Sequence, residues 1–196
     1  MKDMLKLIAA LTIISTVSGG LLAMVNSKTR EPIRRAVETE KSAAIRNVLP
    51  VCDNDPNTDS IIVEHGGKQW TFYIGRNAGT FVGAAFEATS PEGYGGDVNI
   101  MAGVSDKGTV QAIEILPPKK ETPGLGAKIS GNEFRSQFAD KNIRGTSWKV
   151  AKDGGDIQEI TAATISSRAV VKALEAGLNA FVAHETIVRN TGAEAN

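Results

Sequence analysis

Residues 98–116, VNIMAGVSDKGTVQAIEIL, decide the fold class of this chain. They contain two runs rich in β-branched and aliphatic residues, 100–104 and 110–116, which flank the tripeptide Asp-Lys-Gly at 106–108. Aspartate and glycine between two such runs are typical of a tight turn, so the stretch predicts an antiparallel β-hairpin. A proline pair at 117–118 ends the second strand, because proline cannot donate a hydrogen bond to a sheet.

Two more strands are expected before this hairpin and two shorter elements after it. Residues 70–74 and 80–88 are rich in β-branched and aromatic residues and are separated by glycine, and the first hairpin strand extends back to residue 98. After the proline pair, residues 133–138 predict a short helix and residues 148–150 a short strand.

A long helix is predicted from Ser166 to about Val188. Its apolar side chains recur at helical spacing and form a stripe that is typical of a helix packed on a core. The stripe consists of Val170, Leu174, Leu178, Phe181 and Val182. Strands followed by a packed helix, without regular βαβ alternation, indicate an α+β fold.

An uncharged stretch of 21 residues, LIAALTIISTVSGGLLAMVNS, lies between Lys6 and Lys28. A helix of about 20 residues spans the hydrocarbon core of a bilayer, so the stretch is long enough. Its Ser, Thr and Gly residues are compatible with a membrane helix, because hydroxyls bond back to their own helix. A cleavable signal peptide is the alternative, but its apolar region usually has about 7–15 residues and a small-residue cleavage site. We therefore predict a transmembrane anchor over residues 1–28.

The next segment, residues 29–50, has apolar residues at near-helical spacing and predicts a stalk helix. Pro32 suits the first turn of such a helix, and Pro50 ends it. Residues 51–60, VCDNDPNTDS, are polar and predict a loop. The expected domain follows over residues 51–190, and residues 191–196 are expected to form a flexible tail.

The charges divide the chain into two unlike parts. Lys and Arg number 22, and Asp and Glu also number 22, but residues 1–35 carry six basic and two acidic side chains, which leaves 16 basic and 20 acidic ones for the remainder. Zero net charge argues against a nucleic-acid binder, which needs a basic surface. A basic end joined to an acidic body points to a membrane-facing end. The excess of Lys and Arg after the anchor would place the body in the cytoplasm by the positive-inside rule, but these charges do not settle the side.

Residues that ligate metals or form disulfides are scarce. The single cysteine, Cys52, excludes an internal disulfide and a cysteine-built metal site, and His65 and His184 are the only histidines. We predict no metal site and no catalytic residue.

A glycine-rich loop, EGYGG at residues 92–96, is the first candidate binding segment. Its glycines, Gly95 among them, let the backbone approach a ligand, and Tyr94 offers a stacking face. An ordinary glycine-rich turn before a strand is the alternative.

A second loop, ETPGLG at residues 121–126, is followed by Lys128. Proline and glycine fix its backbone, so Leu125 is displayed on a rigid loop and Glu121 and Thr122 are held for hydrogen bonding. The glycine spacing does not match the dinucleotide fingerprint GxGxxG, which excludes a Rossmann interpretation. A structural turn remains the alternative.

A third segment, ITAATISS at residues 160–167, lies where the long helix begins. Either Thr161 or Thr164 serves as an N-cap on the simplest interpretation. The functional interpretation is a phosphate site, because a helix N-terminus offers free N–H groups and partial positive charge. Four hydroxyls within seven residues exceed what one cap requires.

The order and spacing of EGYGG, ETPGLG and TAATISS resemble the FMN-binding domain of the G subunit of Rnf electron-transport complexes, and the related C subunit of the sodium-translocating NADH:quinone reductase shares the pattern. The N-terminal apolar helix and the VLP at residues 48–50 fit as well. The resemblance implies an α+β fold in which a transmembrane helix and a stalk helix precede an FMN-binding domain that contains an antiparallel sheet.

In that family FMN is joined by a phosphoester to the second threonine of the motif D-x-x-[ST]-G-A-T. The resemblance carries this role to Thr164, with Thr161 and Ala163 at matching positions. The chain departs from the motif at Gln158, where Asp is usual, and at Ala162, where Gly is usual. The implied cofactor-binding residues are Thr164, Thr161, Ala162, Ala163, Ile165, Tyr94, Gly95, Glu121, Thr122, Leu125, Gly126 and Lys128.

The resemblance further implies a membrane-anchored flavoprotein that relays electrons within an ion-translocating complex. Its partners would be the other membrane and redox subunits, with an external flavin transferase for maturation, and its flavin domain would lie outside the cytoplasm. Two alternatives stay open: a C-subunit-like component of the quinone reductase, which is generally longer, and a non-redox membrane-anchored binding module.

Overall fold

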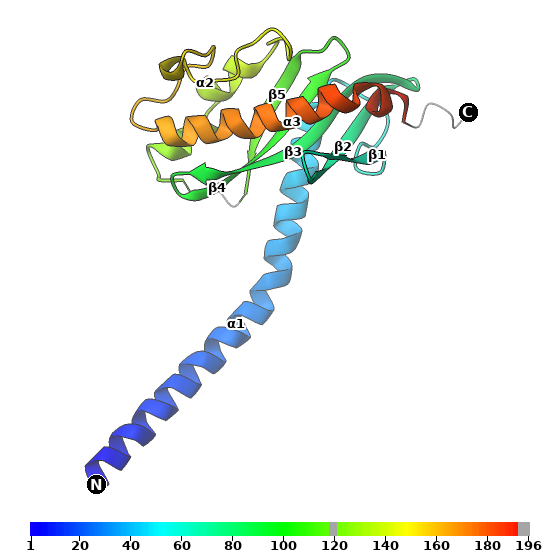
Figure 1. Cartoon of the computed structure of the whole chain (residues 1–196). Coiled ribbons are helices and arrows are strands. Elements are labelled where there is room, and N and C mark those ends of the chain that lie inside the picture. Colours follow the sequence, from blue (N-terminus) through cyan, green and yellow to red (C-terminus); the bar gives the residue numbers. More distant parts are fainter. Residues whose placement is uncertain (118–120, 192–196) are drawn as a thin grey trace. The chain divides into compact units, whose positions relative to one another are not determined.

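The computed structural model describes residues 1–117 and 121–191 and forms two compact units, Met1–Thr39 and Glu40–Asn196. Helix α1 (Lys2–Val48) begins in the first unit and ends in the second (Figure 1). Of the predicted tail, only Thr191 belongs to the described residues, and Pro118 also lies outside them.

Within the first unit α1 exposes every side chain of residues 1–30. The helix is long and apolar enough to cross a membrane by length and composition. The hydroxyl groups of Thr12 and Thr16 donate to the carbonyls four residues earlier, each at 2.8 Å, as expected for hydroxyls in a membrane helix.

The prediction that Pro32 occupies a first helical turn was wrong. Helix α1 runs without interruption through the predicted anchor and stalk, and Pro32 lies in its interior. A proline inside a helix removes one backbone hydrogen bond, and the turns on both sides continue past it.

Five strands form one antiparallel sheet in the second unit, in the order of the sequence. They are β1 (Ser60–His65), β2 (Lys68–Asn77), β3 (Thr80–Gly93), β4 (Gly96–Ser105) and β5 (Val110–Leu116). The predicted β4–β5 hairpin is confirmed, and Gly108 in its turn has φ +73°. A meander of sequential hairpins keeps every connection between the strands short.

Strand β1 was missed by the sequence interpretation, which ended its loop at residue 60 and assigned nothing to the residues that follow. The β1–β2 turn contains Gly66 and Gly67, whose φ values of +61° and +72° suit a two-residue hairpin turn. The expected strand at residues 148–150 was also wrong, since Val150 makes only a single bridge to Ile157.

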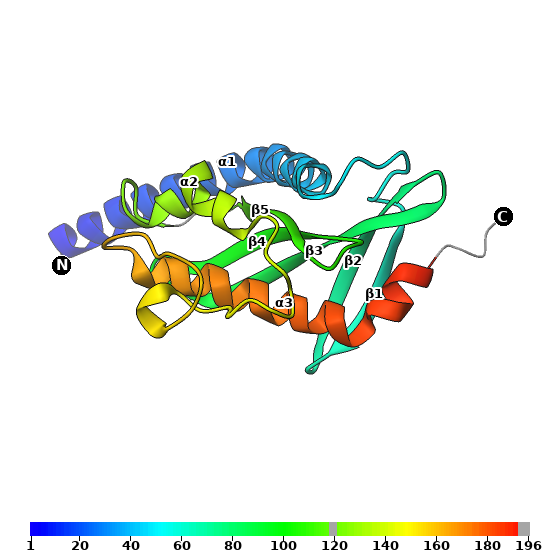
Figure 2. The same ribbon diagram turned by 90° about the horizontal axis from the view of Figure 1, so that it is seen from above.

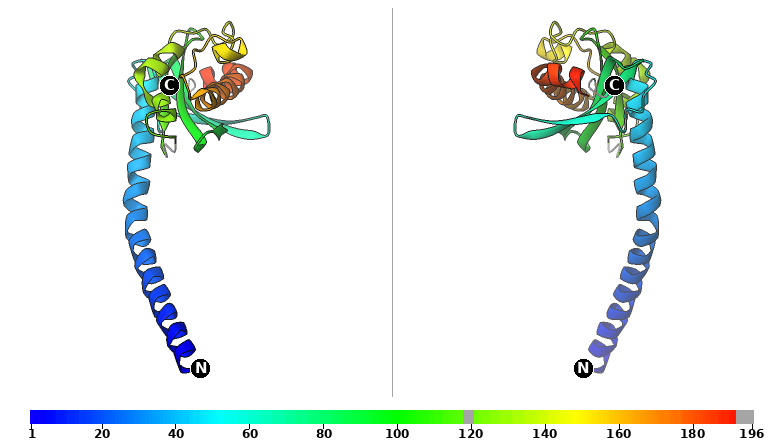
Figure 3. Two further views of the ribbon diagram at one scale, coloured as in Figure 1. Left: turned by 90° about the vertical axis from the view of Figure 1, so that its left-hand side faces the viewer. Right: turned by 90° about the vertical axis from the view of Figure 1, so that its right-hand side faces the viewer.

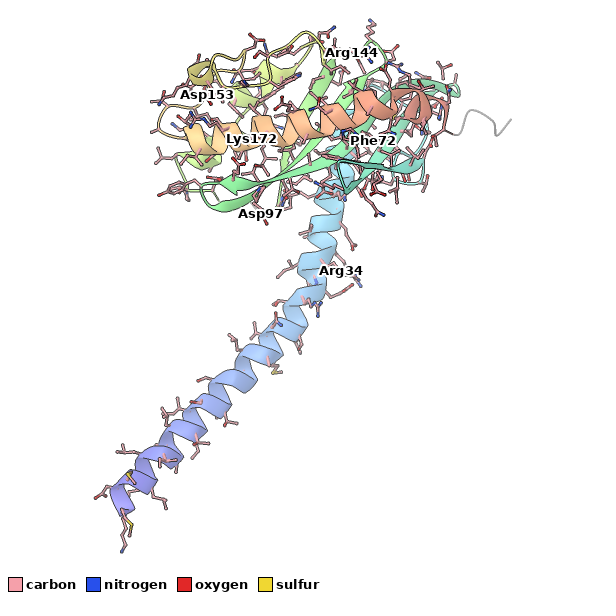
Figure 4. The ribbon with its side chains drawn as sticks, in the orientation of Figure 1. Arg34, Phe72, Asp97, Arg144, Asp153 and Lys172 are labelled. Carbon is pink, nitrogen blue, oxygen red and sulfur yellow. The ribbon has the colours of Figure 1, made fainter. Side chains whose placement is uncertain are left out.

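Helix α3 (Thr164–Asn190) covers one face of the sheet, mainly over β3 and β4 (Figure 2). Its predicted apolar stripe is confirmed: four of the five side chains are buried, and Val182 packs against the same core. The rings of Phe72, Phe86 and Phe181 meet beneath the helix, and Phe72 is labelled in Figure 4.

The C-terminal end of α1 covers the opposite face of the sheet (Figure 3). Ala44, Ile45 and Val48 of the helix pack against a small apolar cluster that includes Met101 of β4. Gly103 allows this close approach, because a Cβ atom there would stand 1.8 Å from the Val48 carbonyl oxygen. The sheet is therefore covered on both faces within the second unit.

Short helices fill the connection between β5 and α3. They are η1 (Gly126–Ser130), α2 (Asn132–Arg135), η2 (Ser136–Phe138) and η3 (Ala151–Asp153). The predicted helix at residues 133–138 is thus α2 continued by η2. Phe134 and Phe138 bury their rings against each other at 5.3 Å between centroids, which ties this connection to the core.

Candidate functional site

A cavity of about 390 Å³ lies where the three candidate segments meet. Figure 1 shows that α3 begins near one end of the sheet. The cavity falls within the roughly 300–1,000 Å³ typical of small-molecule sites. It is lined by Tyr94, Glu121, Thr122, Leu125, Gly126, Ala162, Ala163, Thr164, Ile165 and Ser166. All of these residues belong to the second compact unit.

Nine of the twelve predicted site residues therefore line one cavity, and Ser166 is the one lining residue that the prediction missed. Of the other three, Gly95 lies beside the cavity and donates its N–H to Glu121. Lys128 and Thr161 line a neighbouring cavity of about 510 Å³.

The two threonines and the two serines of TAATISS have opposite environments. Thr161 is exposed and Thr164 half-buried, and neither hydroxyl has a hydrogen-bond partner among residues 1–117 and 121–191. Ser166 and Ser167 are buried, at 1% and 0% exposed. Their hydroxyls make hydrogen bonds to Glu121 and to the Ala163 carbonyl, respectively.

The simplest interpretation of this segment, a threonine N-cap on the last helix, was wrong. Helix α3 begins at Thr164, with Ala163 at the N-cap position and no side-chain cap hydrogen bond. The Ser167 hydroxyl instead accepts from the Ile160 N–H at 3.0 Å and closes the loop before the helix. Since no side chain caps the first turn, its N–H groups remain available to an anion.

The carboxylate of Glu121 joins all three candidate segments. It is buried, and its Oε2 accepts a hydrogen bond from the Ser166 hydroxyl at 2.7 Å. Its Oε1 accepts from the Gly95 N–H at 3.3 Å. No local pattern pairs residues 26 and 45 positions apart, so neither bond could be expected from sequence spacing.

Three apolar side chains stand at the mouth of the cavity. Tyr94 is 71% exposed, Leu125 45% and Ile165 49%, and each comes from a different segment. Apolar and aromatic side chains of this kind cover the faces of a flat ring, as in most small-molecule sites.

Ala162 has φ +64°, in the left-handed region. Most residues other than glycine avoid this region, at a cost of roughly 1–2 kcal/mol. The conformation accounts for the glycine that is usual at this position of the motif. The chain adopts the same backbone shape with alanine.

The neighbouring cavity contains Gln158, the second departure from the motif. Its backbone N–H donates to the Gln137 side-chain oxygen at 2.8 Å, and its carbonyl accepts from the Gln137 amide nitrogen at 3.1 Å. The backbone of the segment before Thr161 is thus held by Gln137 of η2.

Two ion pairs join α3 to η3 and to the end of β3, and Asp153 and Lys172 are labelled in Figure 4. Arg168 donates two hydrogen bonds of 2.6 Å to Asp153, and Lys172 pairs with Glu92, the first residue of EGYGG. The hydrogen bonds from the Arg168 guanidinium hold the pKa of the Asp153 carboxyl below its ordinary value. The same pairing raises the pKa of Arg168.

The residues present fit FMN. The first turn of α3 has no side-chain cap, and the Thr164 hydroxyl has no partner within residues 1–117 and 121–191, so this turn suits a phosphate. The apolar mouth suits the flavin ring. No histidine lines the cavity, and the one carboxylate among its lining residues, Glu121, accepts hydrogen bonds from Gly95 and Ser166.

Comparison with known proteins agrees with this assignment. The model of the FMN-binding domain family matches residues 93–179, which include the whole lining of the cavity. The G subunit of the ion-translocating oxidoreductase complex of Methanosarcina acetivorans is 33% identical over 187 residues, which cover 94% of this chain and 97% of that protein. The proteins of the same name from Cronobacter sakazakii and Escherichia coli are each 36% identical, over 87% and 83% of this chain and 86% and 84% of their own.

Identity above 30% over nearly the full length of both chains, with a matching domain at the cavity, shows the family directly. The chain belongs to the family of G subunits of Rnf-type ion-translocating oxidoreductase complexes.

Proposed function

We propose that this chain is a membrane-anchored flavoprotein subunit of an ion-translocating electron-transport complex, and that FMN is attached to it by a phosphoester on Thr164. The observation that carries the proposal is the Thr164 hydroxyl, which lines the cavity at the start of α3 without a partner among the described residues. When bound, FMN supplies the electron transfer, and the protein binds and orients it.

The first turn of α3 would hold the flavin phosphate. Its uncapped N–H groups and the helix dipole favour an anion at Thr164. Ser166 and Ser167 do not compete for the phosphate, because their hydroxyls are bonded within the protein. Thr164 is thus the hydroxyl in this turn that a modifying enzyme can reach.

The flavin ring would be held by the apolar mouth of the cavity. Tyr94, Leu125 and Ile165 approach it from three segments, and burying their exposed apolar surface stabilises binding by roughly 25 cal/mol per Å². Part of the ring edge would stay accessible to redox partners, since the cavity opens to the surface at these residues.

We expect attachment to require a second protein, because no histidine lines the cavity and both oxygens of Glu121 already accept hydrogen bonds from Gly95 and Ser166. A flavin transferase would use a flavin dinucleotide as the activated donor. Thr164 would supply the acceptor oxygen, the nucleotide monophosphate would leave from the flavin-side phosphorus, and the hydroxyl proton would pass to a base of the transferase. The chain contributes the acceptor hydroxyl and its presentation.

The two departures from the family motif are compatible with this modification. Ala162 adopts the left-handed conformation that glycine would adopt, and its side chain is exposed. The segment at Gln158 is fixed through its backbone by Gln137. The acceptor loop therefore keeps a defined shape without Asp or Gly at these positions.

The relatives are named as subunits of a complex, and this supports other membrane and redox subunits as partners of this chain. We place the flavin domain outside the cytoplasm, following the family resemblance. A topology reporter fused after Asn196 is expected to be active only outside the cytoplasm. Activity confined to the cytoplasm would reverse this orientation.

Covalent attachment is tested by expressing the full chain together with a flavin transferase and examining it on a denaturing gel. The wild-type band is expected to fluoresce, and Thr164→Val is expected to be dark because valine keeps the shape but lacks the oxygen. Thr161→Val is the matched control and should stay fluorescent. A dark wild-type band, or a fluorescent Thr164→Val band, would refute attachment at Thr164.

A further inference from the structure

The side chain of Glu121, in the ETPGLG loop, makes a hydrogen bond to each of the other two segments of the cavity. It is 8% exposed, although it is an ionisable residue at a ligand cavity. Ionisable side chains are rarely so buried unless they are paired or hydrogen-bonded. Its two oxygens meet Gly95 and Ser166, which belong to the other two segments.

The space around this carboxylate is closely fitted on two sides. A Cβ atom on Gly126 would stand 2.2 Å from Glu121 Oε2, and one on Gly93 would stand 2.8 Å from Oε1. Both glycines belong to the candidate loops. The lack of side chains at these positions leaves room for the carboxylate between the loops.

From this geometry we infer that Glu121 is a positioning residue of the flavin site. Its carboxylate holds the EGYGG loop, the ETPGLG loop and the first turn of α3 in the arrangement that forms the cavity. Ser166 lies two residues after Thr164, so the bond to Ser166 also fixes the turn that presents Thr164. This inference rests on the proposed function, because it assigns Glu121 a task within the same site.

The hydrogen bonds distinguish positioning from direct contact with the flavin. Each carboxylate oxygen already accepts from a protein donor, so the side chain is used to join protein segments. Glutamine can reproduce both contacts: its oxygen accepts from the Gly95 N–H, and its amide donates to the Ser166 hydroxyl. Alanine can reproduce neither, and it leaves the Gly95 N–H without its acceptor.

The test measures noncovalent FMN binding to the full chain in detergent, by quenching of flavin fluorescence, for wild type, Glu121→Ala and Glu121→Gln. Positioning predicts that Glu121→Ala weakens binding at least tenfold and that Glu121→Gln stays within about threefold of wild type. Glu133→Ala is the control, since Glu133 is exposed and lines the neighbouring cavity. Equal affinity of all variants, or a Gln variant as weak as Ala, would overturn the inference.

Hydrogen exchange of the flavin-free protein provides a second readout that does not need flavin binding. The Gly95 amide is expected to exchange at least tenfold faster in Glu121→Ala and at close to the wild-type rate in Glu121→Gln. Unchanged exchange at Gly95 in Glu121→Ala would refute the positioning role of Glu121, whether or not the wild type binds FMN. A wild type that binds no FMN would count against the proposed function alone. If Glu121→Ala fails to fold, Ser166→Ala takes its place. It removes one of the two contacts of Glu121, so we expect an intermediate effect.

Discussion

Thr161 and Thr164 stand close to Ser166 and Ser167 in the sequence, but the two pairs differ in burial and in hydrogen bonding. Thr161 is exposed and Thr164 is half-buried, and their hydroxyls have no partners among the described residues, whereas the serine hydroxyls are buried and bonded. The Ser166 hydroxyl donates to Glu121, and the Ser167 hydroxyl accepts from the Ile160 N–H and donates to the Ala163 carbonyl.

The difference separates hydroxyls that hold the backbone of the site in place from hydroxyls that are left available to a ligand. The serines fix the entry to α3, and their loss should cost folding stability. The threonines should contribute little to folding, and the role that we propose for Thr164 is attachment of a ligand. The four hydroxyls are therefore best separated by substituting each residue on its own.

Gly126→Ala should lower the stability of the protein more than any of these single substitutions. The added methyl group would stand 2.2 Å from Glu121 Oε2 and 3.0 Å from the Ser166 hydroxyl, and so separates the two groups that anchor the serine turn. We expect the free energy of unfolding to fall by about 3 kcal/mol, as for an overpacked core. Denaturant unfolding measures this loss. Gly145→Ala, whose methyl meets its nearest atom at 3.6 Å, is the control, and equal midpoints for both variants would contradict the fitted geometry.

Ser166→Ala and Ser167→Ala should each lower the free energy of unfolding by about 1–3 kcal/mol, because each leaves a buried polar group without its partner. Thr161→Ala and Thr164→Ala should change it by no more than about 0.5 kcal/mol. The measurement is chemical denaturation of all four variants. Threonine variants as unstable as the serine variants would remove the division between the two regions.

Ala162→Gly should stabilise the protein, in contrast to the serine substitutions. Glycine relieves the left-handed strain, and the greater freedom of the unfolded chain offsets part of the gain, so we expect a net increase of about 0.5–1 kcal/mol. Ala176→Gly, on the exposed side of α3, should destabilise by about 1 kcal/mol. If both substitutions destabilise equally, the conformation at residue 162 is not the one described.

The ion pair between Arg168 and Asp153 should give the smallest effect, since both groups are solvent-exposed and salt screens them. The Asp153 pKa is lowered in the folded protein, so its contribution to stability is present above the unfolded carboxyl pKa of about 4 and is lost as the pH falls through the lower folded value. Asp153→Asn should flatten the stability profile slightly below about pH 4. The measurement is thermal unfolding at a series of acidic pH values. If Asp153→Asn and wild type lose stability equally as the pH falls, the contribution of the Asp153 ion pair is refuted.

Local patterns predicted the elements that depend on local rules. The β4–β5 hairpin follows from its turn residues, and α3 follows from its stripe of Leu174, Leu178 and Phe181. Strand β1 was missed because no alternation of polar and apolar residues marks Ser60–His65, and its turn of Gly66 and Gly67 was not recognised. Pro32 was misplaced because a proline that starts a helix and one inside a helix look alike in sequence.

Local patterns marked the three candidate segments, and the family resemblance joined them into one binding site. The three loops are brought together by long-range bonds, above all Glu121 to Ser166 across 45 residues, and no spacing rule encodes such a pair. Ser166 was missed for that reason. The positive φ of Ala162 was also outside the reach of propensity, because alanine rarely adopts it.

Peptide mass spectrometry of the full chain, after expression with a flavin transferase, examines the attachment at Thr164 at the level of single residues. The peptide containing residues 161–167 is expected to gain the mass of FMN less one water, and fragmentation is expected to place this mass on Thr164. The mass should be absent from Thr164→Val and present in Thr161→Val. Flavin mass on Thr161, on a serine or on no residue of this peptide would contradict the division between presented threonines and structural serines.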